Sequence, residues 1–210
     1  MIYFAITDIS AVTDYDVSVL RKRVEKHFFD KTGLKRKDSV CAKAVLCNLL
    51  KEQYGMSDFL VSYKESGKPY IRNSEVHFNL SHSDDIVLCA VGDERVGCDA
   101  EHIKEYNEKI ARRFFTEKEQ MRLDKSRSKA LDFTKLWTLK ESILKYSGEG
   151  MSGGLSTYDF SGCLEAESFD LYGCHFESRV FSDFAISICC EKNGIFQLEA
   201  DIGDIIKNEN

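Results

Sequence analysis

The spacing of hydrophobic positions changes several times along the chain. Apolar residues three or four apart predict a helix over Val17–Phe28, with Asp14 and Asp16 before it as candidate caps. The same spacing predicts a second helix that begins at Asp38 or Ser39 and ends at Tyr54, where Gly55 would stop it. The first quarter of the chain is therefore expected to be largely helical.

After Gly55 the pattern shortens to that of β-strands. Turn residues separate four short segments rich in β-branched and aromatic residues, FLVSY, PYIR, VHFNLS and DIVLCAV, which predict a meander. The first ten residues, MIYFAITDIS, also predict a strand, because they lack the basic leader, long apolar stretch and cleavage site of a signal peptide. These elements would form an N-terminal lobe, residues 1–100.

The second half returns to helices and then to strands. Helical spacing resumes near Asn107 and at Thr116, whose capping box would use Glu119, and the longest helix covers 128–147 before Gly148 and Gly150. Strands are predicted over 169–178, 184–190 and 195–200, and SDFAISICCE weakly echoes the earlier SDDIVLCAVG. We therefore predict an α+β fold in which residues 1–100 and 101–210 form two pseudo-symmetric α/β lobes with the active site between them.

Composition narrows the classes of function. The 210 residues are 43% hydrophobic and carry a net charge of −6, which disfavours general binding to nucleic acid. The longest apolar runs are far shorter than the roughly 20 residues that span a bilayer, so no membrane partner is expected. Eight cysteines without C-x-x-C spacing predict buried thiols rather than zinc ligands, in a reducing cytoplasm.

Two carboxylates follow directly on an apolar strand in the segment VGCDAEHI. Residues two apart on a strand point to the same face, so Asp99 and Glu101 should converge. Close carboxylates repel each other unless a cation lies between them, and oxygen ligands suit Mg²⁺ or Mn²⁺. The alternative is a solvated strand end.

The helical segment KLWTLKESILKYSGEG supplies a further carboxylate and an ammonium group. Glu141 and Lys145 stand at positions i and i+4, which places them together on one face of the helix. Such a pair could take part in catalysis, but an ordinary surface salt bridge has the same spacing.

Two other segments could bind an anion. In ESGKPY, residues Gly67, Lys68 and Pro69 predict a rigid basic turn that could hold an anion or a base, although it could equally be a plain loop. In NLSHSD, Ser81 and His82 offer a hydroxyl and an imidazole that suit phosphate, although a single histidine is often structural.

In this order and spacing the four motifs resemble those of the Sfp-type 4′-phosphopantetheinyl transferases. The family pattern runs GKP, NLSHS, G-x-D-x-E and W-x-x-K-E-[SA]-x-x-K-x-x-G, and the last part matches here from Trp137 to Gly148 at every fixed position. The resemblance is strong over 67–148 and looser over 38–54 and 113–119. Cys98 and Ala100 replace the isoleucine or valine usual beside the aspartate, which alters packing and keeps the carboxylates.

The resemblance implies an enzyme that transfers 4′-phosphopantetheine from coenzyme A to a serine of an apo acyl- or peptidyl-carrier protein and releases 3′,5′-ADP. It implies Mg²⁺, with Mn²⁺ as a substitute, held by Asp99, Glu101 and Glu141. Glu141 would accept the serine proton directly or through water, and Lys145 would steady or protonate the leaving phosphate. The residues expected to contact coenzyme A are Lys43, Lys68, Pro69, Ser81, His82 and Lys145.

The segment 112–129 carries seven basic residues against three acidic ones, which suits docking of an acidic carrier of fatty-acid, polyketide or nonribosomal-peptide synthesis. A solvated pair of helices would have the same composition. Because one chain carries both lobes, a monomer is expected. The other possibilities are a coenzyme-A-binding regulatory protein, a metal-dependent nuclease or phosphatase, and a protein whose charged motifs are purely structural.

Overall fold

The computed structural model describes residues 1–29, 32–149, 154–192 and 194–207. The strands are β1 (Ile2–Asp8), β2 (Val61–Tyr63), β3 (Pro69–Ile71), β4 (His77–Ser83), β5 (Ile86–Gly92), β6 (Val96–His102), β7 (Ser168–Leu171), β8 (Cys174–Val180), β9 (Phe184–Cys190) and β10 (Ile195–Leu198). The α-helices are α1 (Asp14–Val24), α2 (Lys37–Tyr54), α3 (Glu108–Phe114), α4 (Glu117–Lys125), α5 (Lys129–Ser147) and α6 (Ile202–Lys207). This mixture confirms the α+β class.

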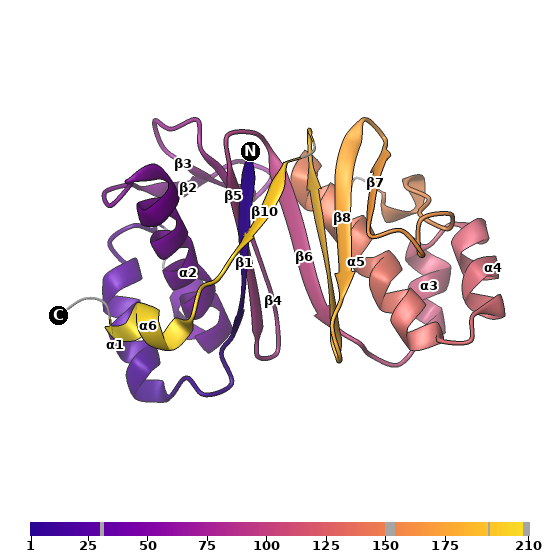
Figure 1. Ribbon diagram of the computed structural model, residues 1–210, viewed down its shortest axis with the longest axis horizontal. Helices are drawn as coiled ribbons and strands as arrows, with labels where there is room; N and C mark the ends of the chain where they lie inside the picture. The colour runs from indigo at the N-terminus through magenta and orange to yellow at the C-terminus, as the bar shows by residue number, and fades with distance from the viewer. Residues whose placement is uncertain (30–31, 150–153, 193, 208–210) are drawn as a thin grey trace.

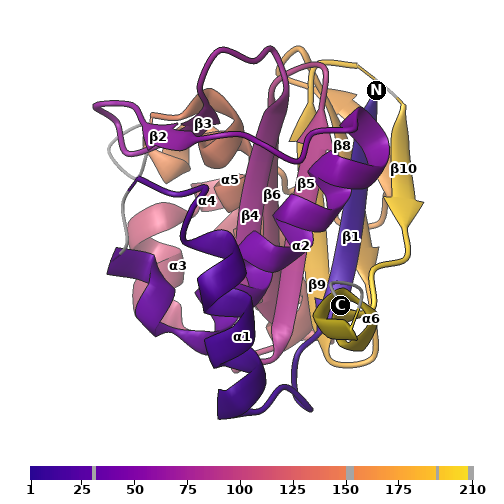
Figure 2. The same cartoon turned by 90° about the vertical axis from the view of Figure 1, so that its left-hand side faces the viewer.

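The elements stack in layers, which Figure 1 shows from the side. Two four-stranded sheets stand side by side, with strand orders β10-β1-β5-β4 and β6-β9-β8-β7, and β2 pairs with β3 in a separate hairpin. Helices α1, α2 and α6 cover the outer face of the first sheet, and α3, α4 and α5 cover the outer face of the second. Figure 2 shows α1 and α2 lying across the front of the first sheet.

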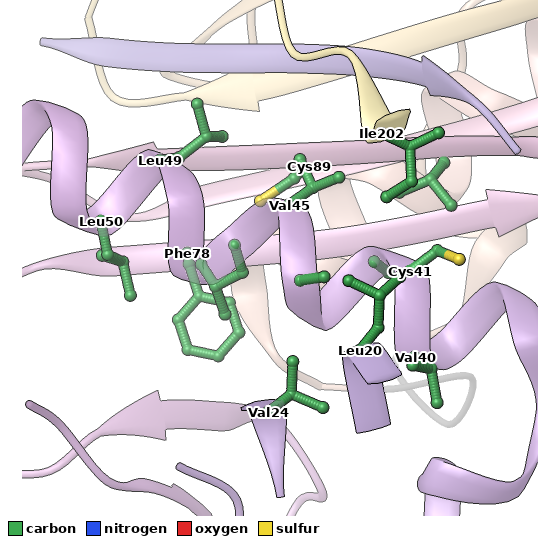
Figure 3. Close-up of a cluster of buried hydrophobic side chains, with 14 of the residues drawn as sticks. Leu20, Val24, Val40, Cys41, Val45, Leu49, Leu50, Phe78, Cys89 and Ile202 are labelled. Carbon is green, nitrogen blue, oxygen red and sulfur yellow. The ribbon is translucent and has the colours of Figure 1, made fainter. Parts of the chain in front are cut away.

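Each pair of adjacent layers encloses its own hydrophobic cluster. Figure 3 shows part of the cluster around α2, which includes Leu20 and Val24 of α1 and Phe78 and Cys89 of the first sheet. A second cluster, which includes Phe4, Leu88 and Ile188, fills the space between the two sheets. A third joins α3, α4 and α5 to the second sheet. The two sheets are therefore buried against each other as well as against helices.

This layering explains the two longest apolar runs of the sequence. Strands β5 and β9 lie inside their sheets and every one of their residues is buried. A strand covered on both faces has no need of polar alternation, so its sequence is almost continuously apolar. The weak echo between residues 83–92 and 182–191 thus falls on strands in similar environments.

Most of the predicted elements are confirmed, with two corrections. The single strand expected over 169–178 was wrong: it is a hairpin, because Tyr172 and Gly173 both adopt positive φ, 55° and 72°, and reverse the chain. The first helix ends at Val24 rather than Phe28, and its cap is Thr13, which exchanges hydrogen bonds with Asp16 in a capping box.

The ends of the other long helices follow the predicted signals. Helices α2 and α5 end at Gly55 and Gly148, both in the left-handed conformation. Thr116 and Glu119 form the expected capping box of α4. Gly150, the other glycine predicted to end α5, lies outside the described residues.

The last elements of the described chain return to its beginning. Strand β10 pairs in parallel with β1, and α6 lies against α1 and α2 (Figure 1). Arg23 of α1 donates hydrogen bonds to the carbonyls of Ile205 and Ile206, both at 2.8 Å. The division into residues 1–100 and 101–210 remains a prediction. Within the described ranges, no helix combines the length and apolarity needed to cross a bilayer.

Candidate functional site

Polar side chains at alternate positions of β4 join the first sheet to β6 of the second. Asn79 accepts a hydrogen bond from the backbone N–H of Cys98 at 2.9 Å. Two residues on, the Ser81 hydroxyl donates to Asp99 Oδ1 at 2.7 Å, and two further on the Ser83 hydroxyl donates to Glu101 Oε2 at 2.9 Å. Side chains two positions apart on a strand share a face, so Ser81 pairs with Asp99 and Ser83 pairs with Glu101.

Helix α5 lies unusually close to β6, and a glycine makes this possible. A Cβ atom at Gly97 would stand 2.0 Å from the carbonyl oxygen of Ser142 and 2.3 Å from the backbone nitrogen of Tyr146. The close approach brings Lys145 Nζ to 2.6 Å from Asp99 Oδ1 and 3.0 Å from Ser81 Oγ. An ion pair thus connects the helical motif to the strand motif.

The three predicted acidic residues border one cavity, which we call the acidic cavity. Its volume is about 270 Å³, and Ser81, His82, Asp99, Glu101, Glu141 and Lys145 line it together with Trp137 and Leu80. Asp99 is buried, and its second carboxylate oxygen, Oδ2, has no hydrogen-bond partner among the described residues. A buried oxygen without a partner is costly, so it marks a position for a cation or a donor.

The electrostatics of the acidic cavity point the same way. Burial raises the pKa of Asp99, although Lys145 and Ser81 act against this increase. Burial also raises the pKa of Glu141, and the negative charges of Asp99 and Glu101 add to the effect. Burial opposes the charge of Lys145, but Asp99, Cys98 and Glu141 together outweigh burial and raise the pKa of the ammonium group. The carboxylates repel one another and would be stabilised by more positive charge.

These residues fit a divalent cation in donor chemistry. Carboxylate oxygens suit Mg²⁺, and the unpartnered Asp99 Oδ2 together with the raised pKa values of Asp99 and Glu141 favours a cation there. The side chains are not already gathered into a metal-binding cluster of three or more acidic, histidine or cysteine residues anywhere in the described chain. Lys145 and Ser81 hold Asp99 Oδ1 instead.

A second cavity, the turn cavity, adjoins the acidic cavity and shares Leu80, Glu141 and Lys145 with it. It measures about 280 Å³ and is also lined by Gly67, Lys68, Pro69 and Gly148. The Lys68 ammonium donates to the carbonyls of Lys145 and Tyr146, at 2.6 and 2.7 Å, at the end of α5. The GKP turn is therefore fastened to α5, and the ammonium nitrogen of Lys68 is already engaged there.

The remaining predicted residues lie in different surroundings. His82 borders the acidic cavity, and its Nδ1 lies 3.3 Å from Asp38 Oδ2 at the start of α2. Burial lowers the pKa of His82 although Asp38 acts in the opposite direction. Lys43 is buried on α2, where it donates to Ser39 at 2.6 Å, and it lines neither the acidic nor the turn cavity.

Sequence reasoning missed several supporting residues. Asp38 faces His82, and Ser83 and Lys104 both hold Glu101, the lysine at 3.1 Å. The alternation of Asn79, Ser81 and Ser83 could have indicated Ser83, because a strand sends all three to one face. No local signal in the sequence identifies Asp38, since its contact with His82 depends on how α2 packs against β4.

The lysine beside Glu141 has a structural role. Lys140 is fully buried, and its Nζ lies 2.8 Å from Glu119 Oε2 and also donates to the carbonyls of Leu155 and Tyr158. Glu119 caps α4 and accepts a hydrogen bond from the backbone of Phe160. The W-x-x-K-E motif therefore combines a residue that anchors α5 with one that borders the cavity.

The basic stripe of residues 112–129 is largely neutralised by nearby acids. Four of its basic residues form ion pairs: Arg112 with Glu108, Lys118 with Asp159, Arg122 with Glu165 and Lys129 with Asp124. Exposed pairs of this kind contribute little and exchange partners easily. Docking of a carrier on this stripe stays a prediction.

Comparison with known proteins gives consistent relatives. Residues 95–189 match the family model described as the 4′-phosphopantetheinyl transferase superfamily. The chain is 43% identical over 96 residues to the 4′-phosphopantetheinyl transferase gsp of Aneurinibacillus migulanus, covering 45% of this chain and 40% of that protein. It is 33% identical to the transferase Sfp of Bacillus subtilis (strain 168) over 63% of this chain and 61% of the relative. For the transferase ffp of Bacillus subtilis the identity is 32%, over 68% and 65%. The matches thus span less than two thirds of these relatives.

Proposed function

The chain belongs to the 4′-phosphopantetheinyl transferase superfamily, and on that premise we propose that it transfers 4′-phosphopantetheine from coenzyme A to a serine of an apo acyl- or peptidyl-carrier protein. One observation carries the proposal: Asp99, Glu101, Glu141 and Lys145 border a single cavity that continues into the cavity of the GKP turn. The two pseudo-symmetric lobes predicted from the sequence would place this groove between them.

Coenzyme A would lie along the two joined cavities. Lys68 and Pro69 would contact the nucleotide through the lysine stem and the turn backbone, because the Lys68 ammonium is engaged at the end of α5. Ser81, His82 and Lys145 would face its phosphates from the acidic cavity. Lys43 is a weaker candidate, since its ammonium group donates to Ser39 of α2 and lies over the ring of Phe28.

Asp99, Glu101 and Glu141 would hold Mg²⁺, for which Mn²⁺ could substitute. When bound, the cation would supply positive charge to the coenzyme's pyrophosphate and to the departing phosphate. Ser81 and Ser83 hold Asp99 and Glu101 in place from β4, so the strand carboxylates are oriented before any ligand arrives.

In the proposed reaction the carrier's serine oxygen attacks the β-phosphorus of coenzyme A. The bond from that phosphorus to the bridging oxygen breaks, and 3′,5′-ADP leaves. Glu141 accepts the serine proton, directly or through water, and its raised pKa makes it a stronger base than an ordinary glutamate. Lys145, kept protonated by Asp99, holds the negative charge of the leaving phosphate.

The acceptor would be a carrier protein, whose acidic surface suits the basic side chains of α3, α4 and the start of α5. Those basic residues that pair with surface acids could exchange them for carboxylates of the carrier, because exposed pairs are weak. Strands β4 and β6, helix α5 and the GKP turn between β2 and β3 all belong to one chain and line the groove, which supports a monomer. Free thiols at all eight cysteines suit the reducing cytoplasm.

The test is incubation with coenzyme A, Mg²⁺ and a panel of apo-carrier proteins, followed by intact-mass measurement of each carrier. Addition of the phosphopantetheine mass to one serine, with release of 3′,5′-ADP, is expected. Glu141→Gln should keep most coenzyme binding and lose transfer, whereas Asp99→Ala should weaken both. Near-normal transfer by either variant would contradict these roles.

The same assay separates the other functions. Coenzyme A binding without any modified carrier would indicate a regulatory protein that keeps the groove. Release of inorganic phosphate, or cleavage of added nucleic acid, without carrier modification would indicate a metal-dependent phosphatase or nuclease. The GKP turn borders the same cavity as Glu141, which favours a substrate that carries a nucleotide next to the reacting phosphate, as coenzyme A does.

A further inference from the structure

A further cavity adjoins the GKP turn and shares only Lys68 and Pro69 with the turn cavity; we call it the basic cavity. It measures about 260 Å³ and is enclosed by the β2–β3 hairpin, the start of β4 and the end of α5. Four nitrogen-bearing side chains line it: Lys64, Lys68, His77 and Arg95. None of its described lining residues is an aspartate or a glutamate.

The positive charges of this cavity are only partly balanced. Arg95 uses one of its donors, Nε–H, for Glu191 at 3.0 Å, and its guanidinium lies over the ring of Tyr146. A guanidinium has five N–H donors, so this one bond leaves it well able to bind an anion. Within the described chain, Lys64 makes no ion pair through its ammonium group.

Neighbouring groups respond to this uncompensated charge. Burial and, to a smaller extent, the charges of Lys64 and Arg95 together lower the pKa of Lys68 to about 8. Burial also lowers the pKa of His77, helped by Lys68, Lys64 and Arg95 and opposed by Glu75. Each cation therefore makes its neighbours harder to protonate, and an anion in the cavity would remove that penalty.

The walls also fit the rest of a phosphate ester. Tyr70, Phe78 and Tyr146 present aromatic side chains, Ser74 and Ser147 present hydroxyl groups, and the volume is below the range of about 300–1,000 Å³ typical of pockets for drug-sized ligands. A cluster of Lys and Arg with hydroxyl donors is the usual recognition chemistry for phosphate. We propose that the basic cavity binds a phosphate group, either as inorganic phosphate or as a small phosphomonoester, at a site distinct from the acidic and turn cavities.

The experiment is a titration of the whole chain with inorganic phosphate and, separately, with phenyl phosphate, followed through the amide chemical shifts of residues 70–78, a segment that lines the basic cavity and not the turn cavity. Saturable shifts of these amides are expected with both probes. Tighter binding of phenyl phosphate would identify a phosphomonoester site that uses the aromatic walls, and equal or tighter binding of inorganic phosphate would identify a site for the free ion. Shifts confined to residues 80–82, in the proposed substrate groove, would overturn the proposal.

Three variants test the assignment of the charges. Lys64→Gln and Arg95→Gln should each weaken phosphate binding about ten-fold or more, because each removes a charge-assisted hydrogen bond. Both side chains are exposed, so the fold should persist, which the amide spectrum reports directly. Glu191→Gln is the matched control: it breaks the same ion pair but keeps the cation, and binding should be at least as tight as in the parent. Parent-like affinity in both lysine and arginine variants would refute the site.

Discussion

Replacement of Gly97 by alanine should disrupt the joint between β6 and α5 on which the acidic cavity depends. The new Cβ would meet the Ser142 carbonyl oxygen at 2.0 Å, and the backbone nitrogen and Cα of Tyr146 at 2.3 and 2.9 Å. All three atoms belong to the helix backbone, so no side-chain rotation relieves the contact. An ordinary contact of 3.4 Å requires the two elements to separate locally by about 1.4 Å.

Such a separation has two measurable costs. Overpacking in a well-packed core usually costs about 1–3 kcal/mol, and a clash with backbone should reach the top of that range or exceed it. The separation would also lengthen the 2.6 Å contact between Lys145 Nζ and Asp99 Oδ1. A misplacement of about 1 Å at a reacting centre can reduce the rate about a hundred-fold. Thermal unfolding and carrier-modification rates measure the two effects.

The control for this substitution is Gly162→Ala. A Cβ at Gly162 meets nothing within 4 Å, and its φ is not in the left-handed region, so alanine should leave both stability and transfer unchanged. A Gly97→Ala protein that unfolds and transfers like the parent would show that α5 does not rest on β6 as closely as the structure indicates, and the argument for a preformed cavity would fail.

Three further predictions concern buried charge. Lys140→Met should lower the free energy of unfolding by about 3–5 kcal/mol in chemical denaturation, because it leaves the carboxylate of Glu119 buried without its ammonium partner. Adding Glu119→Gln should recover part of the loss, and no recovery would contradict the pairing. Lys68, followed by carbon NMR of its side chain, should titrate near pH 8 in the parent and at higher pH in Lys64→Gln. The same group titrates near 10.5 in the unfolded chain, so the unfolded chain binds more protons between pH 8 and 10.5. The contribution of Lys68 to the free energy of unfolding should therefore rise across that interval. Mg²⁺ should raise the melting temperature of the parent and have a much smaller effect on Asp99→Asn, and equal shifts in both proteins would exclude Asp99 as a ligand.

The sequence was informative where one local pattern decides the structure. Glycines at positions 55 and 148 end their helices because they accept the left-handed conformation, and the capping box at Thr116 forms as its spacing requires. The hairpin at Tyr172 was missed, because a tyrosine with positive φ is rare and no Asn-Gly or Asp-Gly pair marks the turn. The residue types at this turn therefore give no hairpin signal, and the reversal is recognised only from the pairing of β7 with β8.

The candidate site shows a similar division. Motif spacing indicated the strand carboxylates and the helical pair, but the ammonium of Lys68 points to the carbonyls that end α5, and Lys43 lies inside α2. Lys43 bonds to Ser39, one turn back on its own helix. The outcome for Lys68 instead depends on the packing of elements that are distant in sequence, which no pattern within the turn contains. The contact between Asp38 and His82 was unforeseen for the same reason.

The fixed positions of the NLSHS segment have a structural explanation that its chemistry alone does not provide. Strands β4 and β6 belong to different sheets, so no backbone ladder joins them. Asn79, Ser81 and Ser83 replace that ladder with four side-chain hydrogen bonds, of which two end on the carboxylates of Asp99 and Glu101. The residues that hold the two sheets together are therefore the same residues that orient the acidic groups, and weakening the joint must also disturb the cavity.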